Sequence, residues 1–353
     1  MHLVTFERRA SDDGRRPAEG ERVGAMGDAA LGLESLDSLT VGARRLGAVL
    51  GEGSHAGDVV DLNRALAIKL ACDDVGAPEA EADSLLPTDA RVFLRRLPGS
   101  LDSARAALDF VQDALERYDA PDVLRAGVVE ARARVRLCAP VPRPGKIVGV
   151  VGHYPAAGGA GGGEPVLFLK APSAVIGPED EIRLPEAGGQ VDFEGELAVV
   201  IGLPARRVGE GAALSHVAGY CAANDLSVRG YRQAGGQHFI GSSCDGFAPL
   251  GPALVTADEI PDPQALAIRS AVSGEPMQSG RTKEMPFPVA RIVAFASRLM
   301  TLEPGDVLLC GAPAGAGESR VPPRYLRDGD LVEVEVEGVG RLRNYVRGSA
   351  TGW

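Results

Sequence analysis

The stretch "GQVDFEGELAVVIG", Gly189–Gly202, places three carboxylates, Asp192, Glu194 and Glu196, at alternating positions before an apolar run. In a strand, side chains two residues apart project from the same face, about 7 Å from one another. A strand here would therefore gather three like charges, and such a group is costly to bury unless positive charge lies beside it. The stretch predicts a buried strand, "ELAVVIG", that begins at a charged site.

A further acid follows another apolar run, because Asp225 ends the strand-like part of "CAANDLSVRGY". Carboxylates alone favour a hard cation, which would be Mg²⁺ or Mn²⁺, with Ca²⁺ as a third choice. Glu194, Glu196 and Asp225 are therefore candidate metal ligands. A solvated acidic strand face explains the same spacing equally well, so the residues alone leave both interpretations open.

The composition excludes several classes of protein. The chain has 353 residues and a net charge of -11, which argues against a nucleic-acid partner because phosphates require clustered Lys and Arg. No apolar run approaches the roughly 18 residues of a membrane span, and the first residues do not resemble a signal peptide. The five cysteines form no C-x-x-C pair and predict no disulfide framework. We therefore expect a cytoplasmic protein without a nucleic-acid or membrane partner.

The N-terminal part, residues 1–140, predicts a small α/β domain. The strand-like "HLVTF" precedes a Gly- and Ala-rich segment over residues 10–40, which we interpret as a flexible insertion. "RRLGAVLGEGSHAGDVVDLN" predicts two strands that complete a sheet with the first one. "LNRALAIKLA" and "GSLDSARAALDFVQDALERY" predict helices, and the Pro-rich "VRLCAPVPRPGK" marks the domain boundary.

The remaining residues, 141–353, predict a second domain that is mostly β. Short apolar runs separated by Gly and Pro indicate strands, among them "KIVGVVG", "PVLFLK", "GDVLLCG", "DLVEVEVEG" and "GRLRNYV", and the last two predict a hairpin. Only "GEGAALSHVAGY" and "PVARIVAFASRLM" look helical. The predicted fold class is α+β, mostly β, with a barrel or roll as the larger domain.

Five motifs in this second domain resemble those of the fumarylacetoacetate hydrolase family, in order and at similar spacing, over residues 146–346. They are "DFEGELAVVIG", "AANDLSVRGY", "DGFAPLGP", "LEPGDVLLCGAPAGAG" and "LRDGDLVEVEVEGVGRLRN". The resemblance implies a catalytic β-roll, a homodimer, and Mg²⁺ or Mn²⁺ held by Glu194, Glu196 and Asp225. It also implies a 2-oxo or β-diketo acid as substrate, with C–C cleavage, decarboxylation or tautomerisation through a metal-stabilised enolate.

The resemblance extends to other residues of the site. It implies that Arg229 and Lys170 lie near the substrate, Arg229 also as a catalytic candidate. Ser242 stands where family members carry a lysine and is a candidate substrate-binding residue. His238 is another, although its position is usually aromatic in the family and packing is the alternative role.

Three departures from the family pattern make ordinary hydrolysis doubtful. In "VVGHYPAAGGAGGGEPVLF" His153 replaces the usual Asn and Ala157 replaces the usual His, so the water-activating His/Glu dyad of a lid is absent. The Lys replaced by Ser242 is lost, and Ala312 replaces the Thr of a substrate-binding loop. His153, Tyr154 and His238 are the candidates for moving a proton in place of the missing dyad, and His153 comes first because it stands beside the missing dyad. The alternatives are a structural role for His153 and a packing role for His238.

Three hypotheses about function remain. The first is a divergent metal-dependent enzyme. The second is a catalytically silent homologue that serves as a binding or partner protein, which the Gly-rich lid segment favours. The third is a purely structural Ca²⁺ site with no open coordination position. The retained acidic triad favours the enzyme, because a chain without metal chemistry has no reason to keep three neighbouring buried acids.

Overall fold

The computed structural model describes residues 1–9, 43–51, 54–117, 127–155, 163–186, 189–233 and 238–348. The predicted flexible insertion at 10–40 lies outside these residues. The chain divides into two compact units, Met1–Leu137 and Cys138–Trp353; the sequence placed the boundary at 140. No helix of the described part is long and apolar enough to cross a membrane.

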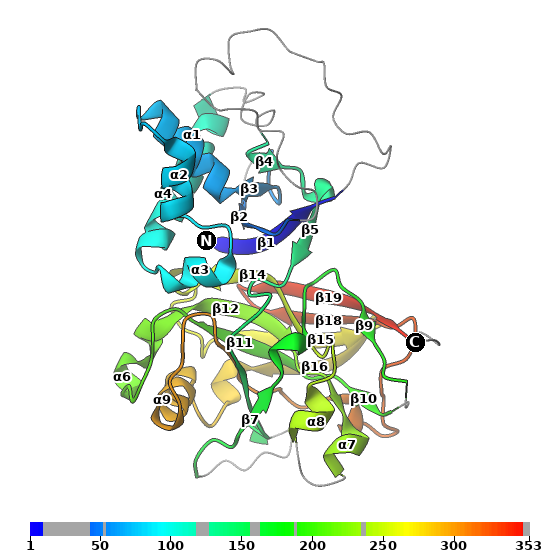
Figure 1. The fold of residues 1–353 in the computed structure, drawn as a ribbon. Helices are drawn as coiled ribbons and strands as arrows, with labels where there is room; N and C mark the ends of the chain where they lie inside the picture. Colours follow the sequence, from blue (N-terminus) through cyan, green and yellow to red (C-terminus); the bar gives the residue numbers. More distant parts are fainter. Residues whose placement is uncertain are drawn as a thin grey trace. The chain divides into compact units, whose positions relative to one another are not determined.

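The N-terminal unit contains an antiparallel sheet in the order β4-β3-β2-β1, with β5 also paired to β1 (Figure 1). Its strands are β1 (His2–Arg8), β2 (Arg45–Val49), β3 (Val59–Asp61), β4 (Val129–Glu130) and β5 (Val135–Cys138). The pairing of β1, β2 and β3 confirms the three predicted strands. Val4, Phe6 and Val60 are buried and form part of the core of this unit.

Four helices belong to the described residues of this unit: α1 (Leu62–Cys72), α2 (Pro78–Leu85), α3 (Ala90–Arg95) and α4 (Gly99–Arg117). α1 and α4 confirm the two predicted helices. α2 was not predicted, because it buries only Ala82 and carries little apolar periodicity. Asp61 caps α1 by accepting a hydrogen bond from the Arg64 backbone N–H.

The C-terminal unit contains two large sheets and a two-stranded sheet of β10 (Val191–Asp192) and β13 (Ser227–Val228). The first runs β14-β12-β11-β17-β6-β7, with parallel pairing at β17–β6 and with β8 parallel to β14. Its strands are β6 (Ile147–Val150), β7 (Leu167–Lys170), β8 (Val175–Ile176), β11 (Gly195–Ile201), β12 (Val217–Asn224), β14 (Ala248–Thr256) and β17 (Val307–Leu309). All seven residues of β11 are buried, as the sequence predicts.

The second sheet runs β16-β15-β18-β19-β9. Its strands are β9 (Ile182–Arg183), β15 (Ala267–Val272), β16 (Glu275–Arg281), β18 (Leu331–Val336) and β19 (Gly340–Arg347). β18 and β19 form the predicted hairpin. The core combines buried side chains of both sheets, such as Leu197 and Val334, with the buried face of α9 (Val289–Leu299). The fold class, α+β and mostly β, is confirmed.

One predicted helix of this unit is wrong over its last four residues. In "GEGAALSHVAGY" only α6 (Glu210–Ala213) and a 3₁₀ turn (Leu214–His216) are helical, and Val217 begins β12. β12 pairs with β11 on one side and with β14 on the other. Hydrogen bonding to two neighbouring strands therefore overrides the local helical pattern in this segment.

Candidate metal centre

The backbone brings the three candidate ligands together at the start of β11. Glu194 lies between β10 (Val191–Asp192) and β11, and its N–H donates to the side-chain oxygen of Asn224 at 3.1 Å. The N–H of Asp225 donates to the Glu194 carbonyl at 2.8 Å, just after β12 ends. One carboxylate oxygen each from Glu194, Glu196 and Asp225 consequently lies within 4.8 Å of the other two.

Two of these carboxylates are deeply buried. Glu196 is 2% exposed and Asp225 is 4% exposed. Burial raises the pKa of Glu196 well above its usual value, and the charges of Asp225 and Glu194 raise it further. Burial likewise raises the pKa of Asp225. The Gly311 N–H donates to Glu196 at 2.6 Å and fixes its orientation. Without added positive charge, this cluster is electrostatically unfavourable.

Arg229 supplies part of the positive charge. It follows β13 (Ser227–Val228), which pairs with β10, and it is 3% exposed. Its Nε donates to Asp192 at 2.9 Å and its Nη2 donates to Glu194 at 2.7 Å. Burial alone would lower the pKa of this guanidinium, but the carboxylates of Glu194 and Asp192 together raise it. Arg229 therefore connects Asp192 to Glu194.

Lys170 also supplies positive charge to the cluster, from a position that is not part of the described cavity wall. Its side chain is fully buried, and its ammonium group donates to the Asp225 carboxylate and, at 3.0 Å, to the Leu226 carbonyl. Lys170 is absent from the described residues that line the cavity. We predicted that Lys170 lies near the substrate. In the structure its ammonium group holds Asp225, a candidate metal ligand.

The residues present fit a divalent cation. Four carboxylates, those of Asp192, Glu194, Glu196 and Asp225, lie together with two cationic side chains, Arg229 and Lys170. A divalent ion would balance the remaining negative charge, which is the condition under which buried acids become favourable. The three candidate ligands offer oxygen atoms only, a donor set that selects hard cations.

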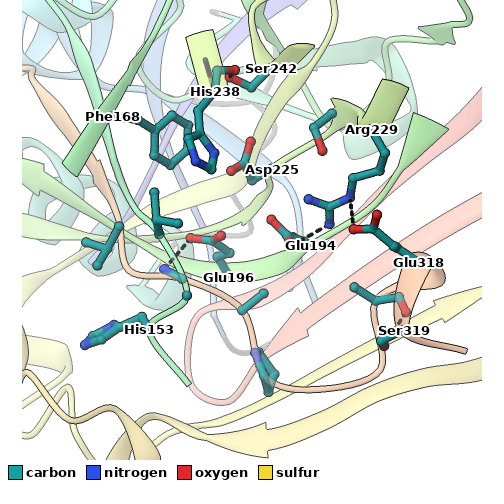
Figure 2. A pocket seen from close by; sticks show the side chains of 18 of the residues that line it. His153, Phe168, Glu194, Glu196, Asp225, Arg229, His238, Ser242, Glu318 and Ser319 are labelled. Atoms are coloured by element: carbon teal, nitrogen blue, oxygen red, sulfur yellow. Dashed lines mark hydrogen bonds and ion pairs between the residues drawn. The ribbon is translucent and has the colours of Figure 1, made fainter. Parts of the chain in front are cut away.

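A cavity of about 230 Å³ opens beside the carboxylates (Figure 2). Glu194, Glu196 and Asp225 form part of its wall, together with Arg229. Another part is apolar and includes Val150, Phe168, Pro313 and Ala314. The cavity thus places a charged region beside an apolar one, as small-molecule sites do.

Sequence reasoning missed several residues of this wall, including Phe168, Ser227, Glu318 and Ser319. Glu318 belongs to a 3₁₀ turn, Gly317–Ser319, and its carboxylate pairs with Arg229 Nε at 3.1 Å. The signal that could have found it is its place directly after "LEPGDVLLCGAPAGAG", because that motif contains the loop of Ala312, which the family resemblance identifies as a substrate-binding loop.

His153 lines the cavity, yet both of its ring nitrogens are already engaged. Nδ1 donates to the Cys310 carbonyl at 2.6 Å, and Nε2 accepts from the Phe287 N–H at 3.1 Å. The ring stacks on Phe287 with centroids 5.5 Å apart, and burial lowers its pKa. These contacts hold a neutral imidazole with no nitrogen left for a substrate proton, so the structural alternative is the one that the geometry favours.

Tyr154 does not line the cavity. Its side chain is 1% exposed and belongs to the core, and its hydroxyl has no hydrogen-bond partner among the described residues. Burial raises the pKa of this hydroxyl, which makes it a poor proton donor. The prediction that Tyr154 moves a proton loses its geometric basis, because the chain turns this side chain into the interior.

Ser242 and His238 both line the cavity from α8 (His238–Ser242). The Ser242 hydroxyl donates to the His238 carbonyl at 2.8 Å, and the His238 ring lies against Phe168 with centroids 5.4 Å apart. Figure 2 shows the His238 ring on the same side of the cavity as Asp225. Their roles toward a substrate stay predictions.

Comparison with known proteins places this arrangement in a family. The model of the fumarylacetoacetate (FAA) hydrolase C-terminal region matches residues 152–347. A mitochondrial oxaloacetate tautomerase of Xenopus laevis is 38% identical over 270 residues, 75% of this chain and 80% of that protein. A human mitochondrial oxaloacetate tautomerase is 39% identical over 270 residues, 75% of this chain and 81% of that protein.

Solved structures lead to the same grouping. A fumarylacetoacetate hydrolase from Exiguobacterium antarcticum superposes with a TM-score of 0.68 and 31% identity, covering 98% of this chain and 99% of that one. A 2-hydroxyhepta-2,4-diene-1,7-dioate isomerase from Mycobacterium marinum gives a TM-score of 0.58 and 39% identity, over 64% of this chain and 82% of that one. The chain belongs to the fumarylacetoacetate hydrolase family.

Proposed function

We propose that the chain is a divalent-metal-dependent enzyme that interconverts the keto and enol forms of a 2-oxo acid, with Mg²⁺ or Mn²⁺ as the ion. The observation that carries this proposal is the convergence of Glu194, Glu196 and Asp225 within 4.8 Å at the wall of a cavity. Their negative charge exceeds what Arg229 and Lys170 balance. The relatives named above include tautomerases and an isomerase, which favours the enzyme over a silent homologue.

Each part of the site has a role in this proposal. Glu194, Glu196 and Asp225 would hold the ion, which when bound stabilises the negative charge of the enolate. Arg229 and Lys170 keep two of these ligands in place by direct ion pairs. The apolar wall that includes Phe168 and Pro313 excludes water from the reacting carbons.

Tautomerisation suits this chain better than hydrolysis, because it moves one proton and needs no activated water. His153 has no free nitrogen for that proton. We assign the proton transfer to His238, because its ring lines the cavity and an imidazole is a common general acid and base. C–C cleavage and decarboxylation pass through the same kind of enolate as tautomerisation, so each 2-oxo acid that is tested should also be checked for these two reactions.

Calorimetry with Mg²⁺ and oxalate tests the ion site first. Chelated oxalate resembles an enolate and needs an ion that keeps two open positions. We expect oxalate to bind only with metal present, and the Glu194→Ala variant to bind neither. A structural Ca²⁺ site predicts metal binding without oxalate binding, and that result would exclude the enzyme.

Proton exchange tests the chemistry. In D₂O with Mg²⁺, the protein should exchange the C3 protons of a 2-oxo acid, observed by NMR. His238→Gln should slow this exchange by about a hundredfold, while His153→Gln should change it little. Equal rates for wild type and His238→Gln would remove the role assigned to His238.

The silent homologue is the second candidate, and the fixed, neutral His153 is the observation that favours it. It predicts metal and oxalate binding with no proton exchange for any acid of a 2-oxo and β-diketo panel. The homodimer and the cytoplasmic location stay predictions. Light scattering on purified protein tests the dimer.

A further inference from the structure

We propose that Glu318 restricts this cavity to 2-oxo acids with a single carboxylate, the one that chelates the ion, and an uncharged remainder. This inference rests on the proposed function and adds a substrate class to it. Its basis is the distribution of charge on the cavity wall.

Arg229 is the one arginine or lysine among the described residues that line the cavity. Its guanidinium contacts three carboxylates: Asp192 at 2.7 Å, Glu194 at 2.7 Å and Glu318 at 3.1 Å. Nη1 is buried and makes no hydrogen bond within the described part of the chain. The positive charge itself is already matched, so it offers little to a second carboxylate.

Glu318 is held at this place by its own backbone. The N–H groups of Gly317 and Glu318 donate to the Asp192 carboxylate at 2.7 and 3.1 Å. A Cβ at position 317 would lie 1.9 Å from the Arg324 carbonyl, so the close approach of the turn requires glycine there. The Glu318 side chain is 43% exposed and lines the cavity (Figure 2). It is a fixed negative charge at the solvent side of the site.

The rest of the described wall contains no further arginine or lysine, and its two histidines are His153, which is neutral, and His238. Val150, Phe168, Ala312, Pro313 and Ser242 are uncharged, and Lys170 lies behind Asp225. Glu318 adds a fifth carboxylate to those of Asp192, Glu194, Glu196 and Asp225, and the five outweigh Arg229, Lys170 and a divalent ion together. A second carboxylate on the substrate would therefore meet excess negative charge, and such repulsion is a means of excluding a competing ligand. The relatives named above carry the names of dicarboxylates, oxaloacetate and a heptadiene-dioate, so we infer that this chain differs from them in substrate.

A matched pair of ligands tests the inference. 2-Oxopentanoate and 2-oxoglutarate share their length and their chelating group and differ only at the far end, methyl against carboxylate. Calorimetry on the Mg²⁺-loaded full chain should give at least about tenfold tighter binding of 2-oxopentanoate, the scale of one uncompensated charge at a partly solvated site. Glu318→Gln keeps the shape and removes the charge, so it should reduce this preference by about tenfold, mainly through tighter 2-oxoglutarate binding.

Two further variants serve as controls. Glu318→Asp keeps the charge and should keep most of the preference. Glu275→Gln removes the same charge from a residue that pairs with Arg320 at 3.0 Å and lies outside the cavity wall, so the preference should be unchanged. Equal or tighter binding of 2-oxoglutarate by the wild type would overturn the inference and leave the proposed function standing, as would an unchanged preference in Glu318→Gln. Failure to bind either acid with Mg²⁺ present would overturn the proposed function itself.

Discussion

Two buried ionic clusters, one in each unit, have opposite balances of charge. In the N-terminal unit, Asp61 is fully buried and contacts Arg45 and Arg8, and Glu130 contacts Arg8 at 2.6 Å. Arg64 lies in the same cluster, where burial and the charge of Arg8 lower its pKa. Here three arginines surround two acids. In the C-terminal unit, four carboxylates lie with one arginine and one lysine.

The difference separates an architectural cluster from a binding site. Asp61 caps α1 and joins two strands to it, so its charge is satisfied by the protein's own groups. Glu196 accepts one backbone N–H and faces two other acids, so the protein's own groups do not satisfy its charge. A fold tolerates such a cluster when a ligand completes it. The following predictions test this contrast.

The largest expected effect is on stability without metal. Asp61→Asn leaves buried arginines without their partner and should lower the free energy of unfolding by about 3 kcal/mol. Glu196→Gln removes a repelling charge, keeps the acceptor for Gly311, and should not lower the stability of the metal-free protein. Urea titrations in the presence of a chelator measure both. Equal losses in the two variants would show that the clusters do not differ in kind.

Metal affinity should reverse the order of the two variants. Glu196→Gln should weaken Mg²⁺ binding at least about a hundredfold, equivalent to about 2.7 kcal/mol. Asp61→Asn should leave the affinity unchanged, provided that the measurement is made where it is folded. Calorimetry gives both values. Unchanged Mg²⁺ binding in Glu196→Gln would place the ion elsewhere.

The dependence of stability on pH gives a third test. The pKa of Glu196 in the folded, metal-free protein lies above its unfolded value. Its contribution to stability is then fully present below the ordinary carboxylate pKa and is lost as the pH rises through the folded pKa. Between about pH 5 and about pH 8, wild type should lose about 1 kcal/mol or more relative to Glu196→Gln. Saturating Mg²⁺ should reverse this trend, because metal binding displaces protons.

The smallest expected effect concerns His153. His153→Gln loses at least one of two buried hydrogen bonds and should cost about 1 kcal/mol of stability. It should change Mg²⁺ affinity by less than about threefold, because the ring bonds only to backbone groups. A large loss of metal binding would mean that this wall residue and the carboxylates form one unit.

Strands with a continuous apolar pattern or a regular alternation could be predicted from the sequence, and a strand interrupted by Pro and Gly could not. β11 is buried at every position, and the hairpin of β18 and β19 alternates between buried and more exposed residues. β14 was missed because its sequence, "APLGPALVT", contains two prolines and a glycine. It becomes a strand because β12 and β8 flank it and supply its hydrogen bonds.

Residue types in the site could be predicted, but side-chain directions could not. The three acids converge because strand periodicity and the β11–β12 register put them together. Lys170 is the last residue of β7, and its neighbour Leu169 is 46% exposed. The Lys170 side chain is buried instead, because it pairs with the buried Asp225. Tyr154 points into the core for a similar reason of packing. These directions depend on neighbours that are distant in the sequence.

Asp192 accepts hydrogen bonds from Arg229 and from the N–H groups of Gly317 and Glu318, yet it is not itself a candidate ligand. This fully buried carboxylate connects the turn of Glu318 to Glu194 through the guanidinium that both acids contact. Directed evolution of substrate choice at position 318 would therefore disturb ion coordination as a side effect. Libraries that retain a hydrogen-bond acceptor at 318 would keep the two traits separable.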